Sequence, residues 1–391
     1  MTDGFGSPAA LRVFFYVQHL LGIGHLVRAS RIAEAMVSAG MEVTLVTGGS
    51  RIEGFPKPGV RHVQLPTVLA SSSSFSGLAQ EDGTPVDATF EAQRTARLLQ
   101  VFHDQQPDVV LIEAFPFGRR QMRFELLPLL DAISKASPRP LLLSSVRDIL
   151  QENRKPGRDQ ETVDHIKVHF DGILVHGDPS FVRLEETFPL AADIADKVFY
   201  TGLVAPGEPE PSTDHFDVVV SAGGGAVGGA LINAALDAQQ LLGDQRRWCV
   251  ITGPNLPQLE FETLGARVPP NVSLFRFRPD FPNLLPKAEV SISQAGYNTV
   301  CDLLRARCAS ILIPFASGGE TEQTVRAQKL EEMGLAIVVE EADLSGEAVA
   351  DALQRAAMLR SPPTMNMHLD GAHQTSRIIG DMTASSAKTD N

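Results

Sequence analysis

The sequence lacks the cysteine pairs, the basic balance and the long apolar runs that mark several common classes of protein. Its three cysteines among 391 residues are widely spaced and odd in number, so they indicate a reducing cytoplasm rather than a disulfide framework. A formal net charge of −13 argues against general nucleic-acid binding. No apolar run approaches the roughly 20 residues of a membrane span, and residues 1–10 lack the features of a signal peptide.

The usual sequence signs of a metal site are absent as well. No Asp-x-Asp sequence occurs, so we do not expect a divalent ion held on a diphosphate by that motif. His165 and His169 are spaced for one face of a helix, but no third ligand is evident. We therefore expect neither a metal nor a cofactor. An anionic ligand would then be stabilised by backbone N–H groups and helix ends.

The chain does contain an alternation of buried strands and helices that runs twice. The first strand leads through a glycine turn into a helix whose apolar residues, from Leu26 to Val37, share one face and whose end is marked by Gly40. Such units imply parallel sheets, and two runs imply two doubly wound, Rossmann-like α/β domains facing a cleft. We predict strands at 11–17, 43–47, 109–113, 141–145, 172–176 and 198–202, and then at 218–221, 248–252, 272–275, 289–293, 310–314 and 336–339.

The boundaries follow from composition. A first domain is predicted at 11–204, a Pro- and Glu-rich linker at 205–211 and a second domain at 212–365. A C-terminal helix at 366–382 could cross back to the first domain, and 383–391 is expected to be a disordered tail. Residues 70–86, rich in Ser and Gly, are expected to form a mobile loop. Ligands of such sheets bind beyond the carboxyl ends of the strands, so the cleft is the expected site.

Two glycine turns suggest phosphate binding. The turn from Gly22 lacks a third glycine, whereas the turn with Gly223, Gly224, Gly225 and Gly228 matches the dinucleotide fingerprint. The strands that follow end Thr47-Gly48-Gly49 and Thr252-Gly253, without the acidic residue that a nicotinamide enzyme uses for ribose. We therefore expect the amides of Gly223, Gly224 and Gly225 to contact phosphate and disfavour NAD.

The first half offers candidates for acid–base chemistry. His25 ends the first glycine turn, where a neutral imidazole could take a proton from a hydroxyl; the alternative is an exposed loop histidine. His19 and Gly24 lie in the same loop and are candidates for acceptor binding. Asp148 follows a strand end and could orient His25, bind an acceptor, act as the base, or be a salt-bridged surface carboxylate.

Another strand end carries Glu113 and a basic-aromatic run. Glu113 and the run, in particular Phe115, are candidates for acceptor binding. The run could instead contact a membrane surface, or it could be a solvated helix start over a packed core. Its members are Arg119, Arg120 and Arg123 among Phe115, Phe117 and Phe124.

The second half carries the most informative stretch. The strand that ends before Gly296 opens a helix, whose N-terminus can hold an anion. Asp302 lies inside that helix and could accept hydrogen bonds from sugar hydroxyls. Glu320, Glu322 and Gln323 crowd a second helix start. Amides and carboxylates beside a phosphate site suit a nucleotide-sugar.

This stretch resembles the donor half of the GT-B glycosyltransferases, in particular the family 28 type that includes the lipid-II-forming UDP-N-acetylglucosamine transferases. The resemblance implies that Asp302 holds the ribose, that Glu322 and Gln323 hold the donor sugar, and that the backbone from Arg278 to Phe281 cradles uracil. Glu322 departs from the Gln-Gln pair of that family. The donor-binding residues so implied also include Gly296, Asn298, Thr299, Gly319, Glu320 and Thr321.

The resemblance implies an inverting, metal-independent transferase that moves a sugar from a UDP-sugar to a hydroxyl acceptor, with the first domain binding the acceptor. That acceptor could be a glycolipid, a polysaccharide precursor or a small molecule. A cytoplasmic protein with peripheral contact at the inner membrane face fits this reading. Alternatives are a UDP-sugar epimerase or hydrolase on the same fold, and a non-catalytic nucleotide-sugar binder.

Overall fold

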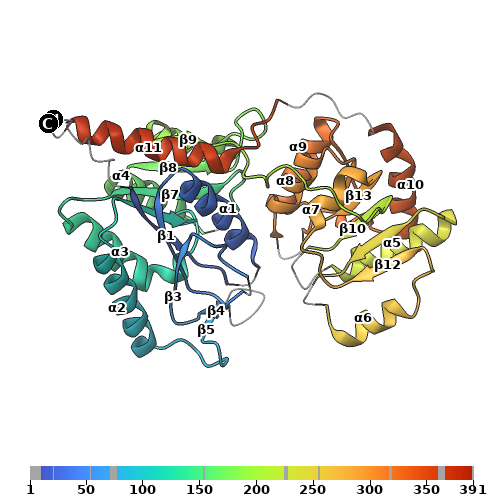
Figure 1. The fold of residues 1–391 in the computed structure, drawn as a ribbon, viewed down its shortest axis with the longest axis horizontal. Coiled ribbons are helices and arrows are strands. Elements are labelled where there is room, and N and C mark those ends of the chain that lie inside the picture. The colour runs from blue at the N-terminus through green and yellow to red at the C-terminus, as the bar shows by residue number, and fades with distance from the viewer. Residues whose placement is uncertain are drawn as a thin grey trace, which may run out of the picture.

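The computed structural model describes residues 10–20, 22–52, 54–70, 77–152, 155–223, 228–253, 256–316, 319–359 and 366–389. Figure 1 shows two domains side by side, each built on one parallel sheet. The prediction of two doubly wound α/β domains is therefore confirmed. Among the described residues, no helix combines the length and the apolar character needed to span a membrane.

The first domain contains a seven-stranded parallel sheet in the order β3-β2-β1-β6-β7-β8-β9. Most of its strands are buried on both faces, as expected when helices cover both sides of a parallel sheet. β9 ends two residues earlier than predicted, because the chain turns at Gly202 and Leu203 pairs with His368. The strands are β1 Arg12–Val17, β2 Glu42–Thr47, β3 Arg61–Gln64, β6 Val109–Glu113, β7 Leu141–Arg147, β8 Gly172–His176 and β9 Val198–Tyr200.

The helices of this domain lie on both faces of the sheet. Helix α1 covers one face through the apolar stripe that the sequence predicts, and α2, α3 and α4 cover the other. The helices are α1 Gly24–Ser38, α2 Ala88–Gln105, α3 Arg123–Lys135 and α4 Arg158–His169, with short 3-10 helices at Arg120–Met122, Leu184–Glu186 and Ala191–Lys197.

The segment before α2 contains more structure than expected. Two short antiparallel strands, β4 Leu69–Ala70 and β5 Leu78–Ala79, lie within or beside the predicted loop at 70–86. Asp87 then caps the N-terminus of helix α2, because its carboxylate accepts a hydrogen bond from the backbone N–H of Phe90 at 2.8 Å. Residues 71–76 lie outside the described residues.

The second domain contains a six-stranded parallel sheet in the order β12-β11-β10-β13-β14-β15. Helices α5 and α10 pack on one face, while α7, α8 and α9 pack on the other, toward the first domain. The strands are β10 Val218–Ser221, β11 Trp248–Ile251, β12 Val272–Phe275, β13 Val290–Ser293, β14 Ser310–Leu312 and β15 Ala336–Val338. The helices are α5 Gly229–Leu242, α6 Gln258–Gly265, α7 Phe281–Leu284, α8 Tyr297–Ala306, α9 Glu322–Glu332 and α10 Gly346–Ala356, with 3-10 helices at Leu285–Lys287, Glu341–Asp343 and Ala357–Leu359.

The last glycine of the 223–228 turn has a packing role. A Cβ atom at Gly228 would lie 2.1 Å from the Cβ atom of Ala222, so only glycine allows α5 to approach the end of β10 this closely. Gly223 has a positive φ of 74°. Gly224 and Gly225 lie outside the described residues.

Helix α11, Gly371–Thr389, returns to the first domain and packs beside α1 (Figure 1). Its approach is tight, because a Cβ atom at Gly371 would lie 2.3 Å from the carbonyl oxygen of Gly202. The predicted crossing is thus correct. The prediction of a disordered tail from 383 is wrong as far as Thr389, because the helix continues past Met382, which packs beside β8.

Candidate active site

The loops at the carboxyl end of the first sheet meet the start of α8 in the second domain. The side-chain amide of Asn298 donates a hydrogen bond to the backbone carbonyl of Gly24 at 3.0 Å. This bond joins the turn that carries His25 to the helix that opens after Gly296. The two halves of the predicted site therefore touch.

His25 and Glu113 form a hydrogen-bonded pair within the first domain. His25 is the second residue of α1, Glu113 is the last residue of β6, and Nδ1 of the imidazole lies 2.6 Å from Oε1 of the carboxylate. Glu113 is 1% exposed and also contacts Arg28 Nη2 at 2.5 Å and the hydroxyl of Ser145 at 3.2 Å. Burial alone would raise the pKa of Glu113, but Arg28 and His25 outweigh it and lower the pKa to about 2.

The imidazole of His25 is neutral over the physiological range. Burial, aided by the charge of Arg119, lowers the pKa of His25 to about 3, although the side chain is still 22% exposed. Because ionised Glu113 can only accept, the Nδ1–H group of His25 donates to it. Nε2 then carries a lone pair, and it has no partner among the described residues. His25 is thus oriented to take a proton, and the lowered pKa means that the imidazolium must be stabilised as it forms.

The carboxylate that orients His25 differs from the one expected. Glu113, predicted to bind an acceptor, is the partner of His25. Asp148, predicted to orient His25 or act as the base, is fully buried and accepts two hydrogen bonds from Arg326 of α9, at 2.7 and 3.0 Å. A carboxylate so engaged is not available for proton transfer, which corrects the prediction for Asp148.

Tyr297 is the centre of a buried network between the domains. Its ring lies 5.2 Å from the guanidinium carbon of Arg28 and 5.6 Å from that of Arg326. Its hydroxyl donates to the carbonyl of His176 at 2.8 Å and accepts from the N–H group of Val204 at 2.9 Å. Glu322, predicted to hold the donor sugar, pairs with Arg326 at 2.6 Å and with Arg147.

Asp302 also takes part in an interdomain ion pair. Its Oδ1 atom lies 2.9 Å from Nη2 of Arg31 in α1, and the residue is 7% exposed. Burial raises the pKa of Asp302 to about 6, an effect that Arg31 opposes. The residue predicted to hold ribose is therefore easily neutralised by a modest fall in pH.

The loop before α9 contacts the first domain as well. The side-chain amide of Gln151 bridges the carbonyl of Gly319 and the N–H group of Thr321, at 3.0 and 3.3 Å. Glu320 accepts a hydrogen bond from the N–H group of Glu322 at 3.1 Å, and Gln323 accepts one from Phe315 at 3.2 Å. These bonds fix the start of α9.

The remaining predicted residues are more dispersed. The side chain of Arg278 is held by Asp214 and Asp280, and its carbonyl accepts a hydrogen bond from Phe281. His19 is 3% exposed, and its Nε2–H group donates a hydrogen bond to the carbonyl of Ser50 at 3.1 Å. Its Nδ1 atom is buried and has no hydrogen-bond partner among the described residues. Thr299 lies partly buried in the first turn of α8.

Phe115 does not line a site. Its ring is fully buried, with the rings of His165 and Phe170 at centroid distances of 5.8 and 6.5 Å. The prediction that it binds an acceptor is wrong, because the side chain turns into the core under α4. No group of three or more potential metal ligands occurs among the described residues.

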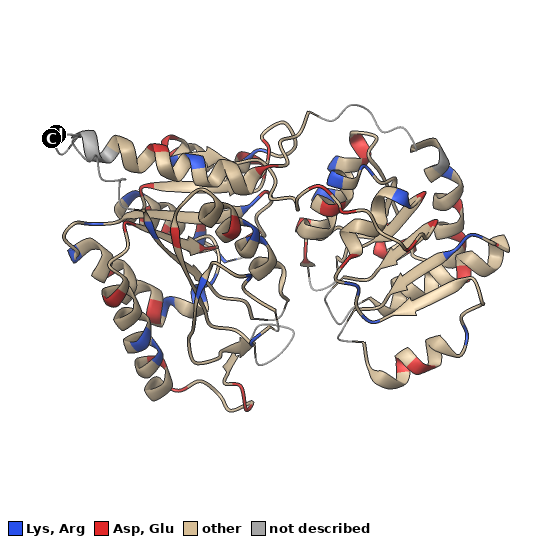
Figure 2. Cartoon of the chain, viewed as in Figure 1, with Lys and Arg blue, Asp and Glu red and all other residues tan. Residues whose placement is uncertain are grey.

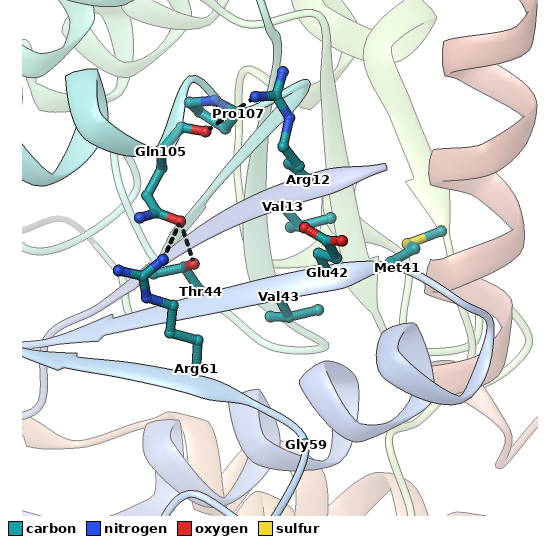
Figure 3. A pocket seen from close by; sticks show the side chains of 10 residues that line it. All are labelled: Arg12, Val13, Met41, Glu42, Val43, Thr44, Gly59, Arg61, Gln105 and Pro107. Carbon is teal, nitrogen blue, oxygen red and sulfur yellow. Dashed lines mark hydrogen bonds between the residues drawn. The ribbon is translucent and has the colours of Figure 1, made fainter. Parts of the chain in front are cut away.

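A cavity of about 260 Å³ lies at the opposite edge of the first sheet, where β1 and β2 begin (Figure 3). Its polar groups bond to one another, since Arg61 and Thr44 both donate to the side chain of Gln105, at 3.3 and 2.9 Å. Arg12 pairs with Asp108. We assign no function to this cavity.

Residues that sequence reasoning missed hold the site together. They are Arg28, Arg31, Ser145, Arg147, His176, Tyr297 and Arg326. For Arg28 and Arg31 the sequence did offer one signal, namely their position shortly after His25 on the first turns of α1. Figure 2 shows acidic and basic residues interspersed in both domains, as these pairs require.

Comparison with known proteins supports a common family. Residues 218–379 match the model of the glycosyltransferase family 28 C-terminal domain. The UDP-N-acetylglucosamine–N-acetylmuramyl-(pentapeptide) pyrophosphoryl-undecaprenol N-acetylglucosamine transferase of Burkholderia mallei is 25% identical over 346 residues, which is 85% of this chain and 84% of the relative. The protein of the same name from Thermotoga neapolitana is 28% identical over 176 residues, 45% of this chain and half the length of the relative.

Solved structures share the fold. The calicheamicin glycosyltransferase CalG4 superposes with a TM-score of 0.62 at 16% identity, covering 96% of this chain and 98% of the other. MurG of Acinetobacter baumannii gives a TM-score of 0.59 at 14% identity, covering 96% and 99%. The fold is that of the GT-B glycosyltransferases.

Proposed function

We propose that this chain, a GT-B glycosyltransferase with a family 28 C-terminal domain, moves a sugar from a UDP-sugar to a hydroxyl acceptor with inversion at the anomeric carbon. The printed name of the Burkholderia relative specifies UDP-N-acetylglucosamine as donor and a lipid-linked acceptor. That name supports a UDP-sugar donor here. A glycolipid, a polysaccharide precursor and a small molecule all remain candidate acceptors, and a lipid-linked one would imply peripheral contact with the cytoplasmic membrane face.

The contact between Asn298 and Gly24 carries this proposal. It places the N-terminus of α8, where a diphosphate would lie, directly against the loop that holds His25. The N–H groups of the first turn of α8 have no partner within the helix and carry its positive dipole end. Such a group of amides stabilises a departing phosphate without a cation. We therefore propose a metal-independent reaction.

His25 would act as the general base. Its Nε2 atom takes the proton of the acceptor hydroxyl, and the hydroxyl oxygen attacks the anomeric carbon. The bond from that carbon to the diphosphate oxygen breaks, and its electron pair leaves with UDP. Glu113 holds the ring in the required tautomer and stabilises the imidazolium that forms. One displacement from the face opposite the leaving group gives inversion.

Donor binding would use residues that now contact the first domain. Asp302 bonds Arg31 through Oδ1 only, which leaves Oδ2 for the ribose hydroxyls. Glu322 and Gln323, at the start of α9, would hold the donor sugar. Because Glu322 pairs with Arg147 and Arg326, sugar binding must share or displace these ion pairs.

Calorimetric titration with UDP, without added metal, tests the donor site. We expect micromolar binding by the wild type, weaker binding of NAD, and at least a 10-fold loss of UDP affinity in Asp302→Asn, since a charged hydrogen bond contributes about 1.5 kcal/mol or more. Asp351→Asn, on the exposed side of α10, removes the same charge as a matched control. Preferential NAD binding, or no UDP binding, would overturn the proposal.

Turnover separates a transferase from the other functions that the fold allows. UDP-sugars are screened for UDP release with and without candidate hydroxyl acceptors. Release that depends on an acceptor supports transfer, whereas equal release without one indicates a hydrolase. UDP binding without any consumption of UDP-sugar indicates a binding protein.

A further inference from the structure

Arg119 stands in a backbone conformation that is rare for a residue with a side chain. It follows Gly118 in the loop after β6 and has φ 57° and ψ 29°, in the left-handed region. Ala114, in the same loop, also has a positive φ, 63°. Strained residues of this kind persist where the surrounding structure holds them, and they cluster at ligand sites. The loop therefore aims the side chain of Arg119 in a specific direction.

That direction is toward the histidine loop of the first domain. Nε of Arg119 donates a hydrogen bond to the carbonyl of Gln18 at 2.7 Å, in the residue before His19. The charge of Arg119 lowers the pKa of both His25 and His19, in keeping with a guanidinium held on the loop between them. Arg119 is thus bonded to the loop that leads to the proposed base.

The guanidinium of Arg119 forms no ion pair with a described residue, and the charge of Glu113 acts on its pKa only from a longer distance. Its Nη1 and Nη2 atoms have no hydrogen-bond partner in the described part of the chain, no carboxylate lies within ion-pair distance, and neither nitrogen is fully buried. Neighbouring arginines differ, because each has a carboxylate partner. Arg28 has Glu113, Arg147 has Glu322, and Arg120 and Arg123 have Glu161.

An unpaired guanidinium in this position is unfavourable without a ligand. Burial lowers the pKa of Arg119, so the group has lost much of its hydration. Removing a charge from water without supplying a partner destabilises the folded protein. An anion bound by the two terminal nitrogens would remove that cost, and a planar fork of two N–H donors fits phosphate oxygens.

We propose that Arg119 binds a phosphate group of a substrate beside His25. The assignment rests on the proposed glycosyl transfer, and it names the chemistry of a ligand of that same site. Two sources of the phosphate are possible, the diphosphate of the donor and a phosphate on the acceptor. Either one would place negative charge next to the imidazolium that forms during transfer.

The test compares Arg119→Gln with Arg123→Gln. The control removes the same charge four residues later, on the outer side of the domain where Arg123 pairs with Glu161. Wild type and both variants are titrated with UDP, with uridine, and with glucose 1-phosphate in the absence and presence of saturating UDP. Thermal unfolding checks that each variant is folded, and Arg119→Lys retains the charge if Arg119→Gln does not fold.

A donor contact predicts that Arg119→Gln weakens UDP binding about 10- to 100-fold while uridine binding is unchanged. An acceptor contact predicts a similar loss for glucose 1-phosphate in the UDP-saturated protein, with UDP binding unchanged. Arg119→Lys is expected to fall between wild type and Arg119→Gln in the same titration, because it keeps the charge but loses the fork.

The proposal is overturned if Arg119→Gln, or Arg119→Lys where only that variant folds, binds every phosphate probe as tightly as Arg123→Gln. Failure of the proposed function has a different signature. A wild type that binds neither uridine nor UDP has no donor site, while its titration with glucose 1-phosphate still measures phosphate binding at Arg119.

Discussion

Oε1 of Glu113 lies 2.6 Å from Nδ1 of His25, and Nη2 of Arg28 reaches the same oxygen at 2.5 Å. Arg28 in turn lies over the ring of Tyr297, which belongs to the second domain. The carboxylate that orients the proposed base is thus held by a side chain that also contacts the other domain. The position of the donor domain and the state of His25 are therefore physically connected.

Glu113→Gln is expected to lower kcat by about 100-fold, within the range that a general base contributes. The neutral amide cannot stabilise the imidazolium of His25, and it can present its NH₂ group to Nδ1 and so favour the wrong tautomer. UDP affinity should be unchanged, because Glu113 lies in the acceptor half. A UDP-release assay measures the rate, with Glu185→Gln on the exposed surface as control. A kcat within two-fold of wild type would remove Glu113 from the mechanism.

The fold could be predicted because its causes are local. Each strand is a short apolar run, and the buried face of α1 is visible in the sequence as apolar residues at helical spacing. The prediction failed where distant packing decides the outcome. Helix α11 packs against the first domain and continues past residue 382. Leu69–Ala70 and Leu78–Ala79 form strands because they pair with each other.

The candidate site was predictable only in its glycine turns and helix starts. His25 lies where the sequence indicates, but its partner Glu113 is 88 positions away, and Asp148 meets Arg326 across 178 positions. Periodicity carries no information on such pairs. Arg28 and Arg326, with exposures of 2% and 0%, contradict the usual rule that arginine is exposed, and only the three-dimensional arrangement of their carboxylates explains their burial.

UDP affinity is expected to fall as the pH is lowered through about 6. The pKa of Asp302 is raised to about 6, so the carboxylate is ionised above that pH and protonated below it. Ionised Asp302 accepts hydrogen bonds from ribose hydroxyls better than the acid does. Calorimetry from pH 5 to pH 8 should show this loss in the wild type. It should be absent in Asp302→Asn, and the same pH dependence in that variant would assign the titration to another group.

The buried pair of Asp148 and Arg326 gives a stability prediction. Asp148→Ala should lower the free energy of unfolding by about 3 kcal/mol, because Arg326 loses one of its two carboxylate partners in a buried position. Arg326→Met should cost at least as much. The double variant should cost less than the sum of the two, because it leaves fewer unpaired charges. Urea unfolding measures all three. Additive costs would show that the two side chains do not interact.

His176 should make the protein sensitive to acid. Its side chain is fully buried between the hydroxyls of Ser145 and Thr201, at 2.8 and 3.0 Å, and burial, with Arg28, lowers its pKa to about 3. In the unfolded chain the pKa is near 6.5. Between these values the unfolded state binds more protons, so the stabilisation present above about pH 6.5 is lost as the pH falls, by up to about 1.4 kcal/mol per pH unit. His176→Gln removes this titration, and the glutamine side chain can still form a hydrogen bond to one of the two hydroxyls.

The melting temperature of His176→Gln should fall less between pH 7 and pH 5 than that of the wild type. The control is His103→Gln, on the exposed side of α2, whose melting temperature should fall as much as that of the wild type. Equal falls in all three proteins would mean that the acid sensitivity comes from other groups, of which His25, with its own lowered pKa, is the first to test by the same substitution.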